Sequence, residues 1–336
     1  MTVSLRTSRD AFTERIVSYL WGEWSALGVA GYARSSHSWV IDPEALLLLT
    51  TRFGRYDARL FDEVCDWLRG NGHALSVQRL RHLMKAHPCG EPTVLAAMTE
   101  RLAEESSHAK WKTIRRLVTA PEGVDPRPLF PSSEFFGEAE PVFRRWGWLR
   151  GPVEFRGMSQ APQPDQPATF LFKLRALFGN QARAEVVAWL LAHERGHPAE
   201  IARQTGYFRR SIQLVLNELA ASGHVRVLRM GREKHFFVRH AEWRFLLTWP
   251  NAKVFPRWVC WAPLFQAITI FHEALSIPGL EDRSERVQAM QLREALDEGL
   301  PSLAAADLAH RFESIRGQKG GEFIRSLLAE LDTMLP

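Results

Sequence analysis

The segment that most constrains how this 336-residue chain can fold is residues 200–239, where apolar residues change from helical to alternating spacing. A helical stretch begins at Glu200 and meets Gly206, a residue that suits a tight turn. Apolar residues then recur at helical spacing, at Ile212, Val215, Leu216 and Leu219. After Gly223 they alternate, which predicts two strands over 224–229 and 234–239. The pattern therefore predicts a helix, a turn, a second helix and a hairpin.

Positive charge is concentrated in the same part of the chain. The net charge is +5 overall, but residues 168–240 hold twelve Lys and Arg against five Asp and Glu, a net of +7. Residues 241–336 hold ten against thirteen. A local basic excess is what attraction to a phosphate backbone requires. The charge pattern thus favours nucleic acid as the partner of this segment.

Helical patterns dominate the rest of the chain, apart from residues 1–37, which give no clear pattern. Asp42 followed by Pro43 predicts a helix start. The predicted helices are 44–50, 57–69 (with an apolar face), 76–85 (capped by Ser76), 92–105, 110–118, 170–178, 182–193 (capped by Asn180), 242–248, 256–275, 283–298, 303–315 and 322–335. The predicted fold class is mainly α, with a central helix-turn-helix and a small β-hairpin, flanked by helical domains.

Four segments follow from this pattern. They are an N-terminal helical domain over 1–119, a proline-rich linker over 120–168, the central unit over 169–240 and a C-terminal helical domain over 241–336. Within the linker, residues 146–149 and 153–155 predict a small hairpin around Arg150-Gly151-Pro152. The residue pattern of 63–73 is similar to that of 185–197. This leaves two interpretations of 55–118 open: a degenerate copy of the central unit, or a plain helical bundle.

The run from Glu200 to Val225 resembles the MarR/ArsR-like winged-helix family of bacterial transcription regulators, and with its flanking helix and hairpin the resemblance covers about a fifth of the chain. The resemblance implies that the helix over 208–222 enters the major groove of DNA and that the hairpin contacts phosphates or the minor groove. The residues matching base-facing positions are Arg209, Arg210, Ser211, Gln213 and Asn217; those matching backbone contacts are Arg229, Arg232 and Lys234. Arg can read guanine, and Gln or Asn can read adenine, through paired hydrogen bonds.

Two positions depart from the family pattern. Phe208 stands where a Ser or Thr usually caps the helix, and Leu214 stands where a polar, DNA-facing residue is common. Both bear on which residues read bases, and neither changes the predicted order of elements.

The resemblance implies a DNA-binding transcription regulator, a repressor, that recognises double-stranded DNA as a homodimer, because one short helix reads only a few base pairs. No catalysis, cofactor or metal is expected. The flanking helical domains would supply dimerisation or a surface for a protein or small-molecule signal. One alternative is an antitoxin-like or defence-associated autoregulator that binds a protein partner through these domains. The aromatic residues Trp249, Phe255, Trp258, Trp261, Phe265 and Phe271 predict either helix core or the lining of a ligand pocket.

Two further motifs contain residue types that can bind metals. His193-Glu194-Arg195-Gly196-His197 matches H-E-x-x-H, which makes a zinc hydrolase a distant alternative. That chemistry needs both His on one helical face, and Gly196 and Pro198 interrupt the helix. His82, His87 and Cys89 form a loose cluster whose spacing matches no strong zinc pattern.

Cysteine usage and hydropathy predict the compartment. The three cysteines, Cys65, Cys89 and Cys260, are sparse and odd in number, which favours a reducing environment. The N-terminus has no apolar signal-like core, and the longest apolar run, 45–49, is too short to cross a bilayer. We therefore expect a cytoplasmic protein that contacts no membrane.

Overall fold

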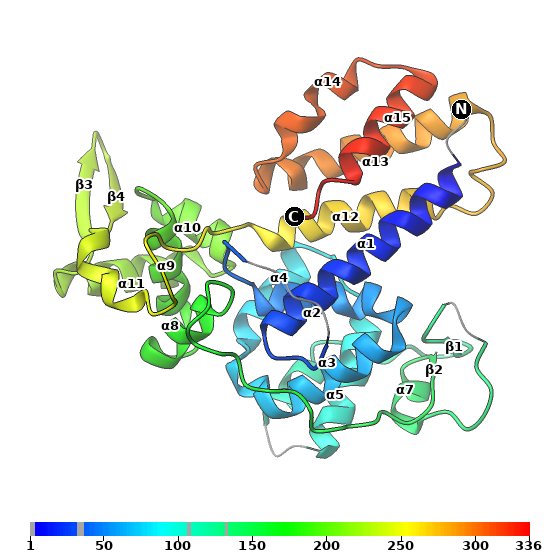
Figure 1. Cartoon of the computed structure of the whole chain (residues 1–336), viewed down its shortest axis with the longest axis horizontal. Coiled ribbons are helices and arrows are strands. Elements are labelled where there is room, and N and C mark those ends of the chain that lie inside the picture. The colour runs from blue at the N-terminus through cyan, green and yellow to red at the C-terminus, as the bar shows by residue number, and fades with distance from the viewer. Residues whose placement is uncertain (1–3, 32–36, 106–108, 132–133) are drawn as a thin grey trace.

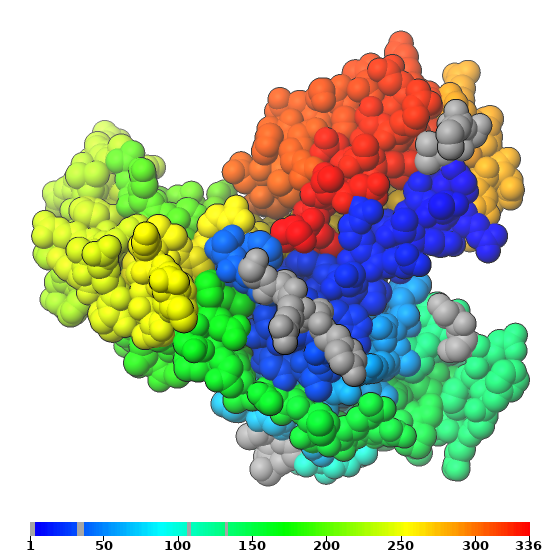
Figure 2. Space-filling model, viewed as in Figure 1, coloured from blue at the N-terminus to red at the C-terminus, as the bar shows by residue number. Residues whose placement is uncertain are grey.

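The fold is mainly helical, as the sequence predicts, and is known from a computed structural model that describes residues 4–31, 37–105, 109–131 and 134–336. Within these residues the strands form two two-stranded sheets. Figure 2 shows the central part of the chain, coloured green to yellow, projecting at one end of the molecule, away from the C-terminal helices.

The N-terminal helices are α1 (Leu5–Ala26), α2 (Pro43–Phe53), α3 (Ala58–Asn71), α4 (Val77–Ala86), α5 (Pro92–Glu105) and α6 (Ala109–Arg115), with 3-10 turns η1 (Gly54–Tyr56) and η2 (Gly72–Ala74). Three predicted starts are confirmed by caps: Asp42 accepts from the Ala45 N–H at 3.0 Å, Asp57 from the Leu60 N–H at 3.0 Å, and Ser76 from the Arg79 N–H at 3.3 Å. Helix α1 was not predicted. In the range 55–118 the described residues form helices and no strand.

The proline-rich region corrects one prediction. The expected hairpin of 146–149 with 153–155 is wrong: β2 (Trp148–Leu149) pairs in parallel with β1 (Arg127–Pro128), beside a short helix α7 (Pro141–Arg145). The reason is that the turn after β2 is held by side chains. Arg150 donates to Asp62 at 2.7 and 3.1 Å, and the Val153 N–H donates to Glu140 at 3.1 Å. The backbone groups that a second strand would use are also taken: the Arg150 carbonyl accepts from the Glu140 N–H at 2.8 Å and the Leu149 carbonyl from the Leu129 N–H at 2.9 Å.

The central unit, as we name it, consists of α8 (Phe170–Phe178), α9 (Ala182–Ala192), α10 (Pro198–Thr205), α11 (Arg209–Ala221), β3 (Arg226–Met230) and β4 (Glu233–Phe237), followed by η3 (His240–Leu246). Strands β3 and β4 pair antiparallel, and Gly196 adds an antiparallel bridge to Phe236, with both N···O distances 2.9 Å. The predicted Asn180 cap is wrong. Gln181 occupies that position, and the Asn180 amide donates to the Leu75 carbonyl at 2.6 Å.

The C-terminal helices are α12 (Trp261–Leu275), α13 (Glu285–Ala305), α14 (Glu313–Arg316) and α15 (Gly320–Leu331), with the 3-10 turn η4 (Ala309–Phe312). The helix predicted from residue 256 starts at Trp261, because the backbone of Arg257 bonds to Ser38 and Val40 instead, at 2.8 and 2.9 Å. The predicted break between 298 and 303 is also wrong, since α13 continues through Pro301.

Two apolar cores hold these elements. One is shared by the N-terminal helices, the proline-rich region and α12–α15, and α1 lies alongside α12 (Figure 1). The other belongs to the central unit and its flanks, from Phe170 to Leu246, with Val40 added from the N-terminal part. The first and last predicted segments therefore pack together, and the predicted segment boundaries stay a prediction.

Candidate nucleic-acid interface

Helix α11 has one buried and one exposed face, and the turn before it sets its direction. Gly206 ends α10 in the left-handed conformation, with φ 73°, and its N–H donates to the Ala202 carbonyl at 3.1 Å. Ile212, Leu216 and Leu219 are buried against the rest of the unit. The exposed face carries Arg210, Leu214 and Asn217, which share it because they are spaced by four and three residues.

The structure places all eight sequence-predicted residues at the surface of α11 and the hairpin. Exposed are Arg209, Arg210, Asn217, Arg229, Arg232 and Lys234, and half-buried are Ser211 and Gln213. Two are brought into contact: the Gln213 amide donates to Asn217 Oδ1 at 3.1 Å. The hairpin residues form a separate group on β3, β4 and their turn (Figure 1).

The exposed cations of α11 and the hairpin differ from their neighbours in having no acidic partner among the residues that the structure describes. Arg226 pairs with Glu242 at 3.4 Å, and Arg183 pairs with Glu218. Within the described parts of the chain, no ion pair involves the five predicted cations Arg209, Arg210, Arg229, Arg232 and Lys234. Their charge is therefore open to an anionic partner.

Phe208 and Leu214, the two residues that depart from the family pattern, are both exposed on α11 or at its start. Phe208 occupies the N-cap position of α11 without any side-chain cap bond. Its ring is 60% exposed and faces the His82 ring of α4, with centroids 5.6 Å apart. Leu214 is 55% exposed in the middle of the helix. Both are apolar groups on the exposed side of α11, which also carries Arg209, Arg210 and Asn217.

A buried ionic network joins the central unit to the N-terminal helices. Arg175 of α8 donates to Glu44 through two bonds of 2.8 Å and to Glu185 of α9 at 2.6 and 3.0 Å. Arg79 of α4 pairs with Asp42 and donates to Glu44 at 2.8 Å. All five side chains are buried. We call these five residues the anchor network.

The carboxylates of the anchor network respond differently to burial. Burial alone would raise the pKa of Glu44, but Arg175 and Arg79 outweigh it and bring that pKa to about 2. Burial raises the pKa of Glu185, and the neighbouring Arg175 offsets this only in part. Its second oxygen, Oε2, has no hydrogen-bond partner among the described residues. Glu44 is thus the well-satisfied acid of the network and Glu185 the poorly satisfied one.

The same network fixes the turn before α11. Arg79 Nε donates to the Thr205 carbonyl at 2.7 Å, and the Tyr207 hydroxyl lies 3.2 Å from the Ser76 hydroxyl. These contacts could not be predicted from the sequence, because Arg79 and Arg175 look like ordinary surface cations in their helices.

The histidine motifs do not assemble as metal sites. His193 follows the last residue of α9 and stacks on Trp189 with centroids 3.8 Å apart, whereas His197 caps α10 by accepting from the Ala199 N–H. The continuous helical face that H-E-x-x-H requires is therefore not formed. In the loose cluster, His87 bonds to Gln266 at 3.0 Å and Cys89 is buried. No group of three or more candidate ligands exists in the residues described.

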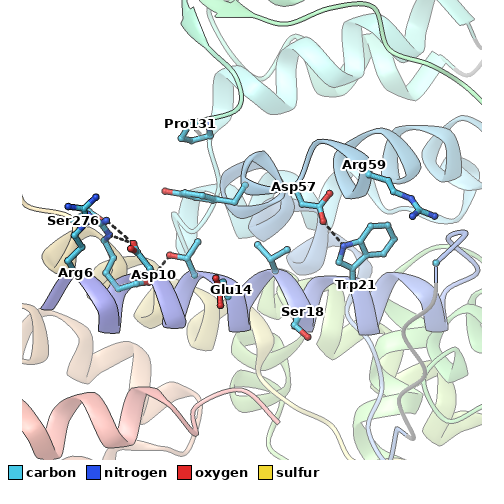
Figure 3. Close-up of a pocket in the computed structure, with 14 residues that line it drawn as sticks. Arg6, Asp10, Glu14, Ser18, Trp21, Asp57, Arg59, Pro131 and Ser276 are labelled. Carbon is cyan, nitrogen blue, oxygen red and sulfur yellow. Dashed lines mark hydrogen bonds and ion pairs between the residues drawn. The ribbon is translucent and has the colours of Figure 1, made fainter. Parts of the chain in front are cut away.

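Two large cavities lie outside the α11 surface. The first, about 1300 Å³, is lined by α1 and the start of α3, where Trp21 donates to Asp57 at 2.8 Å (Figure 3). Its charged residues are of both signs. The second, about 1030 Å³, lies between α10 and the C-terminal helices and includes Trp258, Trp261 and Arg203. The predicted aromatic run is thus divided, since Phe265 and Phe271 are in the core.

Neither hydropathy nor comparison with known proteins assigns the site. None of the helices in the described residues combines the length and apolar character that a bilayer crossing demands. Comparison of the chain with protein-family models, with curated proteins and with solved structures finds no match.

Proposed function

We propose that the protein is a winged-helix transcription regulator that binds duplex DNA through α11 and the β3–β4 hairpin. One observation carries the proposal: Arg209 and Arg210 stand exposed at the N-terminus of α11 without an acidic partner in the described residues. The end of a recognition helix that enters the major groove is normally its N-terminal end. Three further cations of the same kind, Arg229, Arg232 and Lys234, lie on the hairpin.

The roles follow from side-chain chemistry. Arg210 lies on the same face as Asn217 and offers paired donors to guanine O6 and N7. Gln213 and Asn217 can read adenine once their mutual hydrogen bond is exchanged for bonds to the base. The hairpin cations neutralise phosphates, which sets affinity and register but not sequence.

The proposed biological unit is a cytoplasmic homodimer that acts as a repressor. Helix α11 has 13 residues, so it is only ~20 Å long, and its first turns span few base pairs. Two copies on a two-fold symmetric operator would double the sequence that is read.

The proposal is tested by fluorescence anisotropy with labelled duplexes of about 30 base pairs, tiled across the DNA upstream of the gene, at about 50 and 200 mM salt. Binding should weaken steeply with salt. Arg210→Ala should relax base preference at one position by about 1–3 kcal/mol. Arg232→Ala with Lys234→Ala should lower affinity for all duplexes alike. Salt-independent binding, or an Arg210→Ala protein as selective as the parent, would overturn the assignment.

A second candidate is protein contact through the same surface. Strand β3 exposes Val227, Leu228 and Met230, which are 42–44% accessible, and α11 exposes Leu214. Apolar residues on an outer strand are typical of surfaces that pair with another chain. If light scattering shows a heterologous complex with one stoichiometric protein, and no duplex competes with it, this candidate replaces DNA binding.

A further inference from the structure

Helix α4 packs directly on the turn that leads into α11. A Cβ atom built on Gly206 would lie 3.0 Å from Leu83 Cδ2 of α4. The His82 ring faces Phe208, and Arg79 bonds to the Thr205 carbonyl. These contacts cover residues 205–208, which immediately precede Arg209. Helix α4 therefore lies beside the N-terminal end of α11.

The exposed face of α4 is cationic and has no acidic partner among the described residues. Arg81 and Lys85 are both exposed, and they share one face because they are four residues apart. Residues 70–90 contain no Asp or Glu. No ion pair joins either side chain to the other described residues. Two like charges at this spacing repel each other, so the pair does not serve the stability of α4.

The position of α4 relative to α11 is fixed by the anchor network. Arg79, in the same helix as Arg81, is buried among Asp42 and Glu44, and Glu44 is bonded to Arg175 of the central unit. Cutting these bonds would leave buried charges unpaired, so the two helices should move as one body. Helix α4 is thus held in place beside the turn that leads into α11.

From this geometry we infer that α4 is a second DNA-contacting element, whose Arg81 and Lys85 bind phosphates next to the stretch of groove that α11 occupies. The inference rests on the proposed function. A helix in the major groove is flanked on both sides by phosphate backbone, and the groove is only ~12 Å wide. A second helix, ~10 Å across and packed at the N-terminal end of the first, meets one of these backbones. The contact would be independent of sequence.

The test compares a double variant, Arg81→Ala with Lys85→Ala, with a control that loses the same charge. The control is Arg286→Ala with Arg325→Ala, two exposed cations on α13 and α15, which Figure 1 shows at the opposite end of the molecule from the hairpin. The probe is one fluorescein-labelled duplex of about 30 base pairs, titrated across a range of salt concentrations.

The α4 variant should flatten the plot of log binding constant against log salt by about 0.9 per lost phosphate contact, or about 1.8 in total. The control should keep the parent slope. A charge-conserving variant, Arg81→Lys with Lys85→Arg, should keep most of the parent slope. Circular dichroism should show the helix content of the parent for all three variants.

The outcomes separate this inference from the proposed function. Suppose that the parent binds and that Arg210→Ala relaxes selectivity, but that the α4 variant keeps the parent slope. Then α4 does not contact DNA, and the proposed function stands. If the control loses as much slope as the α4 variant, the effect is one of net charge and the inference is again wrong. If the parent binds no duplex at all, both fall together.

Discussion

Replacing Arg175 with Met should destabilise the protein more than the loss of any surface ion pair. Arg175 makes two hydrogen bonds to Glu44, two to Glu185 and one to the Ala74 carbonyl at 2.8 Å. Without it, Glu44 keeps Arg79 and the Ser76 N–H, but Glu185 keeps no partner among the described residues. The variant therefore leaves one buried carboxyl group unpaired.

The magnitude follows from that unpaired group. Breaking a buried ion pair by removing one partner costs about 3–5 kcal/mol. Burial raises the pKa of Glu185 even in the parent, so in the variant this carboxyl escapes part of the cost by taking a proton. A group with a raised folded-state pKa stabilises at low pH and loses that contribution as pH rises. The loss of stability should thus be smaller at pH 5 than at pH 8.

The assay is urea unfolding followed by tryptophan fluorescence, with Arg183→Met as the matched control. Arg183 lies on α9 and pairs with Glu218 at the surface, where both side chains are exposed, so its loss should cost about 0–1 kcal/mol. Combining Arg175→Met with Glu185→Leu should recover part of the stability, because the unpaired carboxyl is gone. The reasoning is refuted if Arg175→Met unfolds within about 1 kcal/mol of the control.

Two further predictions concern single residues. Burial, with smaller contributions from Arg52 and Arg9, lowers the pKa of His272 from 6.5 to about 4. The free energy of unfolding should therefore fall by ~3 kcal/mol as pH drops from 6.5 to 4. In unfolding titrations, His272→Gln should remove most of that pH dependence. Gly206→Ala should cost about 1–3 kcal/mol in urea unfolding, because it combines a positive φ with a close approach to Leu83; a loss below the error of the measurement would show that the α10–α11 turn adapts freely.

What the sequence predicted correctly depends on local interactions. The caps by Asp42, Asp57 and Ser76 involve residues within three positions, so their spacing alone indicates helix starts. The exposed face of α11 follows from its buried positions by helical periodicity. The mainly helical fold and the antiparallel hairpin could therefore be expected without a structure.

What the sequence missed depends on contacts between distant segments. Arg175 and Glu44 are 131 residues apart, and nothing in either helix marks its charge as buried. The predicted hairpin near Arg150 failed for the same reason, since β2 pairs with β1, an earlier and non-adjacent segment of the chain. The placement of α4 beside α11 also required the tertiary structure, so Arg81 and Lys85 could not be chosen from sequence.

The central claim, that α11 and the hairpin meet DNA, is tested most directly by hydrogen exchange with and without a duplex of about 30 base pairs. The account predicts slower exchange in α11, in β3–β4 and in α4, with α13–α15 unchanged. Protection confined to the C-terminal helices, or an exchange pattern that saturating duplex leaves unaltered, would contradict it.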